Sequence, residues 1–170
     1  MSAASGTSST AQNYEQLSYG GQASQWRGQH SQVIADAVAT RTLLPKEAGS
    51  LCMFDSAAGV VYTLPTPVTG MIFRFGTSVT RTSNAHKIIT STSTGSEFLT
   101  GGLWLGNSAA ATGEFFAADG TTIRAVSSNG TTTGGIIGDY YQVTAISSTV
   151  WFVSGILNQT GTAATPFATS

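Results

Sequence analysis

From residue 49 onward the chain repeats short runs of β-branched and aromatic residues, separated by Gly, Ser, Thr and Asn. Examples are residues 59–64 (GVVYTL), 70–75 (GMIFRF) and 149–154 (TVWFVS). Such side chains favour strands, whereas Gly and Asn favour turns. We expect strands near residues 50–54, 59–64, 70–75, 86–90, 97–105, 113–117, 121–127, 135–146 and 149–157. Short strands at this spacing predict an all-β fold, namely an antiparallel β-sandwich or a partly closed barrel.

Side-chain alternation and turn residues support this prediction. In residues 72–75 (IFRF), Arg74 should point away from its two Phe neighbours, and residues 141–146 (YQVTAI) alternate apolar with polar. Successive side chains of a strand face opposite sides, so these runs should bury one face only. Gly59, Gly120 and Gly130 follow Ala, Asp and Asn, and are expected to supply the positive φ of tight turns. Most aromatic side chains of the strands are expected in the core.

The first 30 residues differ from the rest. Leu17 is their only Leu, Ile or Val, and Ser, Gln, Gly and Ala dominate. Such a segment buries too little apolar area to offset its ordering entropy. It nevertheless carries aromatic and Arg side chains of the kinds that anchor interfaces. We therefore expect an extended arm that orders against a partner, rather than a floppy leader. Its predicted contact residues are Tyr14, Leu17, Tyr19, Trp26 and Arg27.

The segment 31–48 allows two interpretations. Ser31 could cap a helix over residues 32–39, with Pro45 closing the segment. The alternative is an extended strand, because residues such as Val33 and Ile34 are β-branched. The predicted organisation is an arm over 1–45 with a short helix in the first interpretation, a β domain over 46–157, and a C-terminal tail over 158–170.

Charge is scarce. Charged residues form 9% of the chain and the net charge is −1, against roughly a quarter charged in ordinary domains. The seven basic residues form no run, so no nucleic-acid or anionic-membrane partner is expected. A net charge close to zero favours association. Residues 1–7 lack the basic and apolar regions of a signal peptide, and no run reaches the length of a membrane span. We therefore expect a product that stays in the cytoplasm where it is made.

Titratable side chains are too few and too scattered to predict catalysis. His30 and His86 are the only histidines, and no Gly-x-Ser-x-Gly motif supports a triad of His86 with Asp119 and a serine. Lys87 next to His86 disfavours a protonated ring. Cys52, the only cysteine, lies in an apolar run and is expected to be a buried hydrophobe.

The carboxylates lead to the same expectation. They occur singly, without the spacings of calcium or zinc sites. Glu97 and Glu114 are the only candidates by strand position for the paired carboxylates of a glycoside hydrolase. Asp119 and Asp139 adjoin glycines, where turn geometry explains them. We expect a non-enzymatic protein without catalytic residues, bound metal or cofactor.

Several phrases of the chain resemble structural proteins of tailed bacteriophages. Residues 60–75 (VVYTLPTPVTGMIFRF) resemble a hairpin of these proteins, and residues 84–90 (NAHKIIT) and 98–102 (FLTGG) look like its continuation. Residues 138–145 (GDYYQVTA) and 149–155 (TVWFVSG) resemble a closing hairpin. The resemblance covers about residues 50–157, and within this group the chain looks like a capsid decoration (cement) protein.

That resemblance implies a β-protein that forms trimers on the outer surface of the capsid. The implied partners are the major capsid protein and further copies of the chain, with the N-terminal arm engaging the capsid or a neighbouring subunit. No catalytic residue carries over. The expected location is the outer surface of the virion head. The alternative function is that of a head-fibre or tail-tip domain that recognises a host surface glycan.

Overall fold

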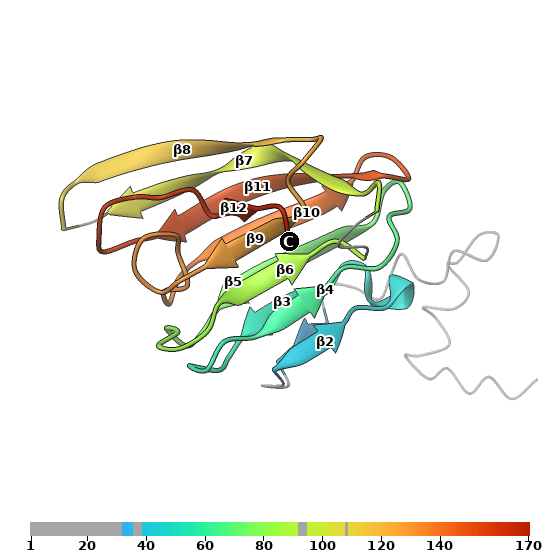
Figure 1. Ribbon diagram of the computed structural model, residues 1–170. Coiled ribbons are helices and arrows are strands. Elements are labelled where there is room, and N and C mark those ends of the chain that lie inside the picture. Colours follow the sequence, from blue (N-terminus) through green and yellow to red (C-terminus); the bar gives the residue numbers. More distant parts are fainter. Residues whose placement is uncertain (1–31, 36–38, 92–94, 108) are drawn as a thin grey trace, which may run out of the picture. The chain divides into compact units, whose positions relative to one another are not determined.

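Two β-sheets pack face to face in the computed structural model, which describes residues 32–35, 39–91, 95–107 and 109–170 (Figure 1). The seven-stranded sheet has the order β1 (Val33–Ile34), β3 (Leu51–Phe54), β5 (Ile72–Thr77), β10 (Tyr140–Ala145), β11 (Val150–Asn158), β7 (Phe98–Asn107) and β8 (Thr112–Asp119). The five-stranded sheet has the order β12 (Phe167–Ala168), β9 (Ala125–Ser128), β6 (His86–Ile89), β4 (Val61–Thr63) and β2 (Thr40–Thr42).

The predicted all-β sandwich is confirmed. Among the described residues the only helical element is one 3₁₀ turn (Pro45–Glu47). Both sheets are mixed: five strand pairs are antiparallel and five are parallel. The largest parallel pairing joins β11 to β7, which brings residues 150–158 beside residues 98–106. Periodicity alone does not reveal such crossovers, because both pairings have the same period of two.

The segment 31–48 follows its strand interpretation where it is described. Val33 and Ile34 form β1, which pairs in parallel with Leu51 and Cys52 of β3. The predicted helix is therefore wrong over residues 32–35. Pro45 begins the 3₁₀ turn instead of closing a helix. The buried Glu47 carboxylate secures this turn, because it accepts hydrogen bonds from the Leu44 amide (2.8 Å) and from the Arg41 guanidinium (2.7 Å).

The β unit extends beyond the predicted limits of 46 and 157. Residues 40–42 form β2, and β12 pairs with β9 near the end of the chain. Phe167, in the predicted tail, is buried. Its position in the core explains why the tail is held against the second sheet, since a buried aromatic side chain contributes about 1.5–3 kcal/mol.

Two predicted strands begin later than expected. In both cases an Asp carboxylate accepts hydrogen bonds from the backbone amides that precede the strand, and these amides form a turn instead. The Asp119 carboxylate accepts hydrogen bonds from the amides of Thr121, Thr122 and Ile123. The strand expected over 121–127 therefore starts at Ala125 as β9. In the same way, the strand expected over 135–146 starts at Tyr140 as β10, after a turn bound to Asp139 that is described below.

The expected alternation and turns are confirmed. Phe73 and Phe75 are buried while Arg74 between them is half-buried. Gly59, Gly120 and Gly130 have φ values of 88°, 74° and 78°, in the region that favours glycine.

Aromatic rings from both sheets fill the core. Phe54, Phe75 and Tyr141 of the seven-stranded sheet stack in series, with centroids 5.3 to 6.5 Å apart. Tyr62 of β4 meets Phe54 edge to face at 5.4 Å, a geometry that the ring quadrupoles favour. The Tyr62 hydroxyl donates to the Met53 carbonyl at 2.9 Å. This bond satisfies its polar end, so the ring lies fully buried between the sheets.

His86 belongs to the same buried cluster. Its ring stacks on Phe54 with centroids 4.7 Å apart, and its Nε2 lies 3.2 Å from the Val79 carbonyl oxygen, which requires Nε2 to carry the proton. The buried Nδ1 has no hydrogen-bond partner among the described residues. Burial is the main cause that lowers the pKa of His86, Arg81 lowers it further, and the Val79 contact and Asp55 oppose this.

Mild acid is therefore expected to destabilise the fold through His86. The unfolded chain binds a proton at the ordinary pKa of about 6.5, whereas the folded chain binds it only at lower pH. The free energy of unfolding should be fully retained above about pH 6.5 and should fall below it, by up to about 1.4 kcal/mol per pH unit. Urea titrations between pH 7 and 5 measure this slope. In His86→Phe the slope should be lost, and an unchanged slope would assign the effect to other groups.

Candidate interaction surface

The residues predicted from the sequence as contacts lie outside the part of the chain that the structure describes. They are Tyr14, Leu17, Tyr19, Trp26 and Arg27. The arm therefore stays a prediction from the sequence, and the surface described here comes from residues 32–170.

The candidates considered for catalysis are held in structural roles. Cys52 is fully buried, as expected, and burial raises the pKa of its thiol to about 12, so it is not a reactive thiolate at neutral pH. His86 is bound to the Val79 carbonyl. The Asp119 carboxylate accepts bonds from its own turn, including one from the Thr122 hydroxyl, and these bonds hold its pKa well below the ordinary value. His86 and Asp119 are not hydrogen-bonded to each other, as a catalytic triad would require.

Glu97 and Glu114 do not form a carboxylate pair. Glu97 is buried just before β7, and both of its carboxylate oxygens accept bonds from Ser91. Glu114 is exposed on β8 and lies opposite Leu105, near the other end of β7. Strand geometry separates the two by about 25 Å, against roughly 5–10 Å in glycoside hydrolases. These residues cannot act on one glycosidic bond.

The described residues hold no group of three or more His, Cys, Asp or Glu side chains arranged to bind a metal ion. Within the same residues, no helix has the length and hydropathy needed to cross a membrane.

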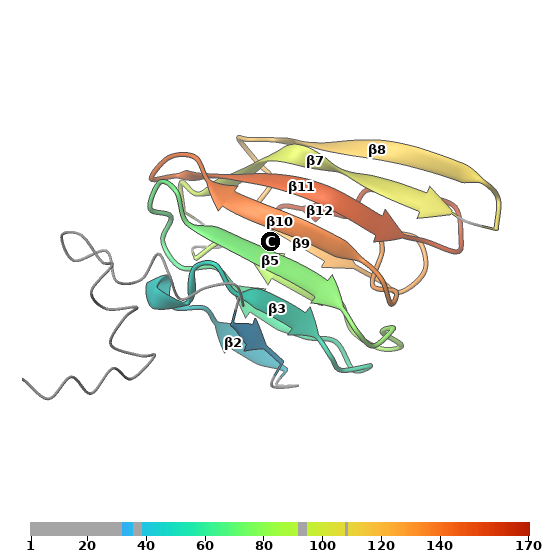
Figure 2. The ribbon, with the colours of Figure 1, turned by 180° about the vertical axis from the view of Figure 1, so that it is seen from behind.

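The most distinctive surface feature is a row of large apolar side chains across the outer face of the seven-stranded sheet. Strand register places Tyr140 (β10) opposite Ile156 (β11), Ile156 opposite Trp104 (β7), and Trp104 opposite Phe115 (β8). Their exposed fractions are 47%, 59%, 56% and 53%, and Phe152 of β11, on the same face, is 42% exposed. We call these five side chains the apolar row. The strands that carry it are seen from their outer side in Figure 2.

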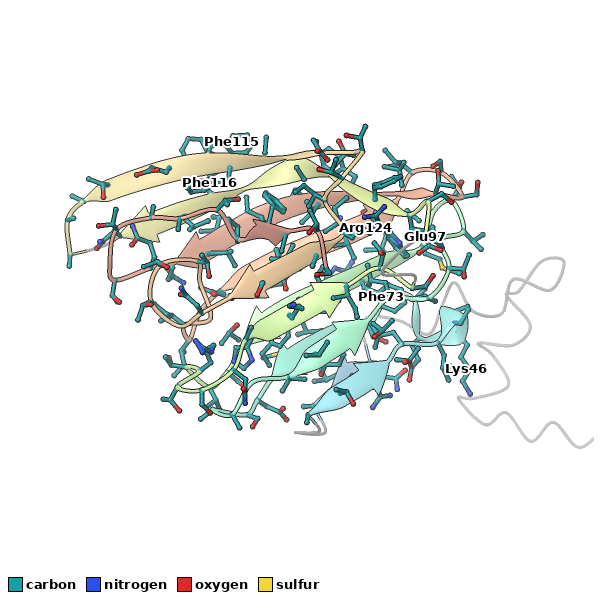
Figure 3. The ribbon with its side chains drawn as sticks, viewed as in Figure 1. Lys46, Phe73, Glu97, Phe115, Phe116 and Arg124 are labelled. Atoms are coloured by element: carbon teal, nitrogen blue, oxygen red, sulfur yellow. The ribbon has the colours of Figure 1, made fainter. Side chains whose placement is uncertain are left out.

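Alternation along each strand explains the row. Trp151, Val153 and Leu157 point into the core, so Phe152 and Ile156 must face outward. The same rule separates Phe115 from Phe116, which leave β8 on opposite sides (Figure 3). Glycine shapes the surface around the rings. A Cβ at Gly102 would lie 2.3 Å from Cζ of Phe115, so only glycine lets this ring lie over β7.

The apolar row carries no charge. Two residues further along the same four strands, the outward-facing positions are polar or small. They are Gln142, Ser154, Gly102 and Ala117. Among the described strands, two charged residues lie on this face outside the row. Asp119, at the far end of β8, has its carboxylate bound by its turn. Arg74 of β5 lies opposite Gln142, and its guanidinium donates to the Gly49 carbonyl. The surface is therefore suited to apolar contact with a neutral partner surface rather than to electrostatic recognition.

Comparison of the chain with protein-family models, with curated proteins and with solved structures finds no significant match.

Most strand aromatics lie in or against the core, as expected, but the prediction did not say which ones would be exposed. The exposed ones are Trp104, Phe115, Tyr140 and Phe152. A signal was available in the sequence. Residues 115–116, 140–141 and 151–152 are adjacent pairs of aromatics within strands. Because neighbouring side chains of a strand face opposite sides, one member of each pair must lie on the outer face. Trp104 lacks such a neighbour, and its exposure follows only from the register with Ile156 and Phe115.

Proposed function

We propose that the protein is a non-enzymatic structural component of a virion, a capsid decoration protein that bridges capsomers on the outer head and stabilises them. The observation that supports a binding role is the uncharged apolar row on a rigid β-sandwich, since exposed apolar patches of this kind mark protein contact sites. The capsid itself as partner is proposed from the resemblance of residues 50–157 to phage structural proteins. The N-terminal arm would add a second contact, and several linked contacts raise avidity by about 10²–10⁴ when all engage together.

The alternative is a head-fibre or tail-tip domain that binds a host surface glycan. Exposed aromatic rings would favour it, because sugars stack on such rings. The rings of Trp104 and Phe115, however, lie 5.5 Å apart with an interplanar angle of 53°. Two rings tilted in this way do not present one flat platform to a sugar chain. We therefore favour a protein partner.

Localisation on the virion tests the proposal. Electron cryo-microscopy of particles is expected to show the protein's density at symmetry-related positions across the capsid. Trp26→Ala should lower the occupancy of these positions, because aromatic anchors dominate interface energetics. Its β domain should unfold at the same temperature as that of the wild type. Gln22→Ala, in the same segment, is the matched control and should keep full occupancy.

Two results would contradict this reading. Density confined to a tail tip or to one vertex would favour the glycan-binding alternative. Full occupancy of Trp26→Ala would remove the arm from the proposal.

A further inference from the structure

We propose that a second copy of this chain packs against the apolar row, with strand β8 at the margin of the contact. The inference is independent of the capsid as partner, since it rests only on the surface of residues 32–170.

The size of the row is the first argument. Its five large side chains would each expose about 200 Å² if free and are roughly half exposed, which gives on the order of 500 Å² of apolar surface. That equals the largest apolar patch of a typical monomer. A stable interface buries about 800 Å² on each partner. The row therefore supplies the apolar centre of an interface, and the surrounding strands supply the rest.

The edge of the sheet is the second argument. β8 is an eight-residue edge strand that pairs only with β7 among the described strands. Residues 112–115 are exposed. Edge strands are normally protected by Pro, Lys, a bulge or a covering segment, since their free backbone groups attract other strands. β8 contains neither Pro nor Lys, and Glu114 is the one exposed charge within its middle. Phe115, the last member of the row, lies on this same strand, so one partner can cover both features.

The absence of charged side chains in the row indicates which partner would bind it. A strongly charged partner would gain nothing from a face whose large side chains are all neutral. A second copy presents the same neutral row, so contact of row with row involves no like-charge repulsion. β8 itself carries the exposed Glu114, which is consistent with a place at the margin of the contact. Homo-oligomeric interfaces are also more apolar than other contacts. The net charge of −1 adds little long-range repulsion between copies.

Analytical ultracentrifugation of the full chain tests the inference. The wild type is expected to sediment as an oligomer at micromolar concentration. The double variant Trp104→Ser/Phe115→Ser should associate at least about 100-fold more weakly, because central aromatic residues contribute most of the binding energy. Val68→Ser is the matched control. Val68 is 58% exposed but lies outside the row, so this variant should keep the wild-type oligomer.

A second variant covers the case in which the double variant does not fold. Ile156→Lys introduces a charge at the middle of the row, at a site that is 59% exposed and so tolerates it in the monomer. Its circular dichroism should match that of the wild type while its oligomer dissociates. A monomeric wild type, or oligomers that persist in both row variants, would overturn the inference. If the wild type is monomeric and the row variants lose capsid occupancy, the row binds the capsid instead of a second copy. The inference of self-association then fails while the proposed function stands.

Discussion

Replacing Trp151 with alanine should lower the free energy of unfolding by about 3–5 kcal/mol, the usual cost of emptying the site of a large buried aromatic. Trp151 is fully buried on β11, and its ring packs 6.1 Å from that of Phe73. The seven-stranded sheet has β11 near its middle, paired with β10 on one side and β7 on the other. The cavity would therefore open beneath strands that are locked in register and cannot collapse into it.

Chemical denaturation of the wild type and of two variants measures this effect. Phe152→Ala, at the next position but on the outer face, should cost less than about 1 kcal/mol in the monomer. Trp151→Phe is informative because the indole Nε1 has no hydrogen-bond partner among the described residues. Phe removes this buried donor along with some volume, so Trp151→Phe should cost much less than Trp151→Ala. Equal losses at 151 and 152 would contradict the assignment of the two faces of β11.

The second large effect is expected at Asp139, whose buried carboxylate joins two parts of the sandwich. Oδ1 accepts bonds from the Asn158 amide (2.6 Å) and its Nδ2 (3.0 Å), and Oδ2 accepts bonds from the amides of Gly135 (2.6 Å) and Ile136 (3.3 Å). Burial raises the pKa of Asp139, and these donors oppose the rise. Asp139→Ala would leave these donors unpaired, at about 1–3 kcal/mol for each one that stays buried. The expected loss in unfolding free energy is about 3 kcal/mol or more.

Thermal unfolding followed by circular dichroism measures the loss. Asp119→Ala is the matched control, because Asp119 also binds backbone amides of a turn but is exposed. Water can replace the carboxylate there, so this variant should be far less destabilised. Asp139→Asn should resemble Asp139→Ala, because its amide nitrogen would face other donors. Similar losses at positions 119 and 139 would show that burial is not what makes Asp139 important.

The sequence predicts the elements better than their arrangement. Alternation around Arg74 and the turns at Gly59, Gly120 and Gly130 were predictable, since they depend on neighbours in the chain. The parallel pairing of β11 with β7 was not, because it depends on contacts between distant segments. The starts of β9 and β10 were misplaced because Asp119 and Asp139 bind amides that propensity assigns to strands.

The apolar row shows the same limit. Adjacent aromatic pairs in residues 115–116, 140–141 and 151–152 indicate that some rings face outward. They do not indicate that large apolar side chains from four strands meet on one line, since this requires the register of three strand pairs. The sequence pointed instead to the arm as the contact segment, and Trp26 and Arg27 stay the residues that test it.

The place of β11 in the seven-stranded sheet has a consequence for synthesis. Of the described strands only β12 follows it in the chain, so β11 is synthesised after β7 and β8, yet it lies between β10 and β7. Until β11 has been synthesised, the edge of β7 that faces away from β8 has no strand to pair with. The hairpin of β7 and β8 therefore cannot join the strands made earlier. Non-local pairings of this kind make folding slow. We therefore expect the sandwich to close only after β11 has been synthesised, so that shortened chains ending before residue 150 would not fold.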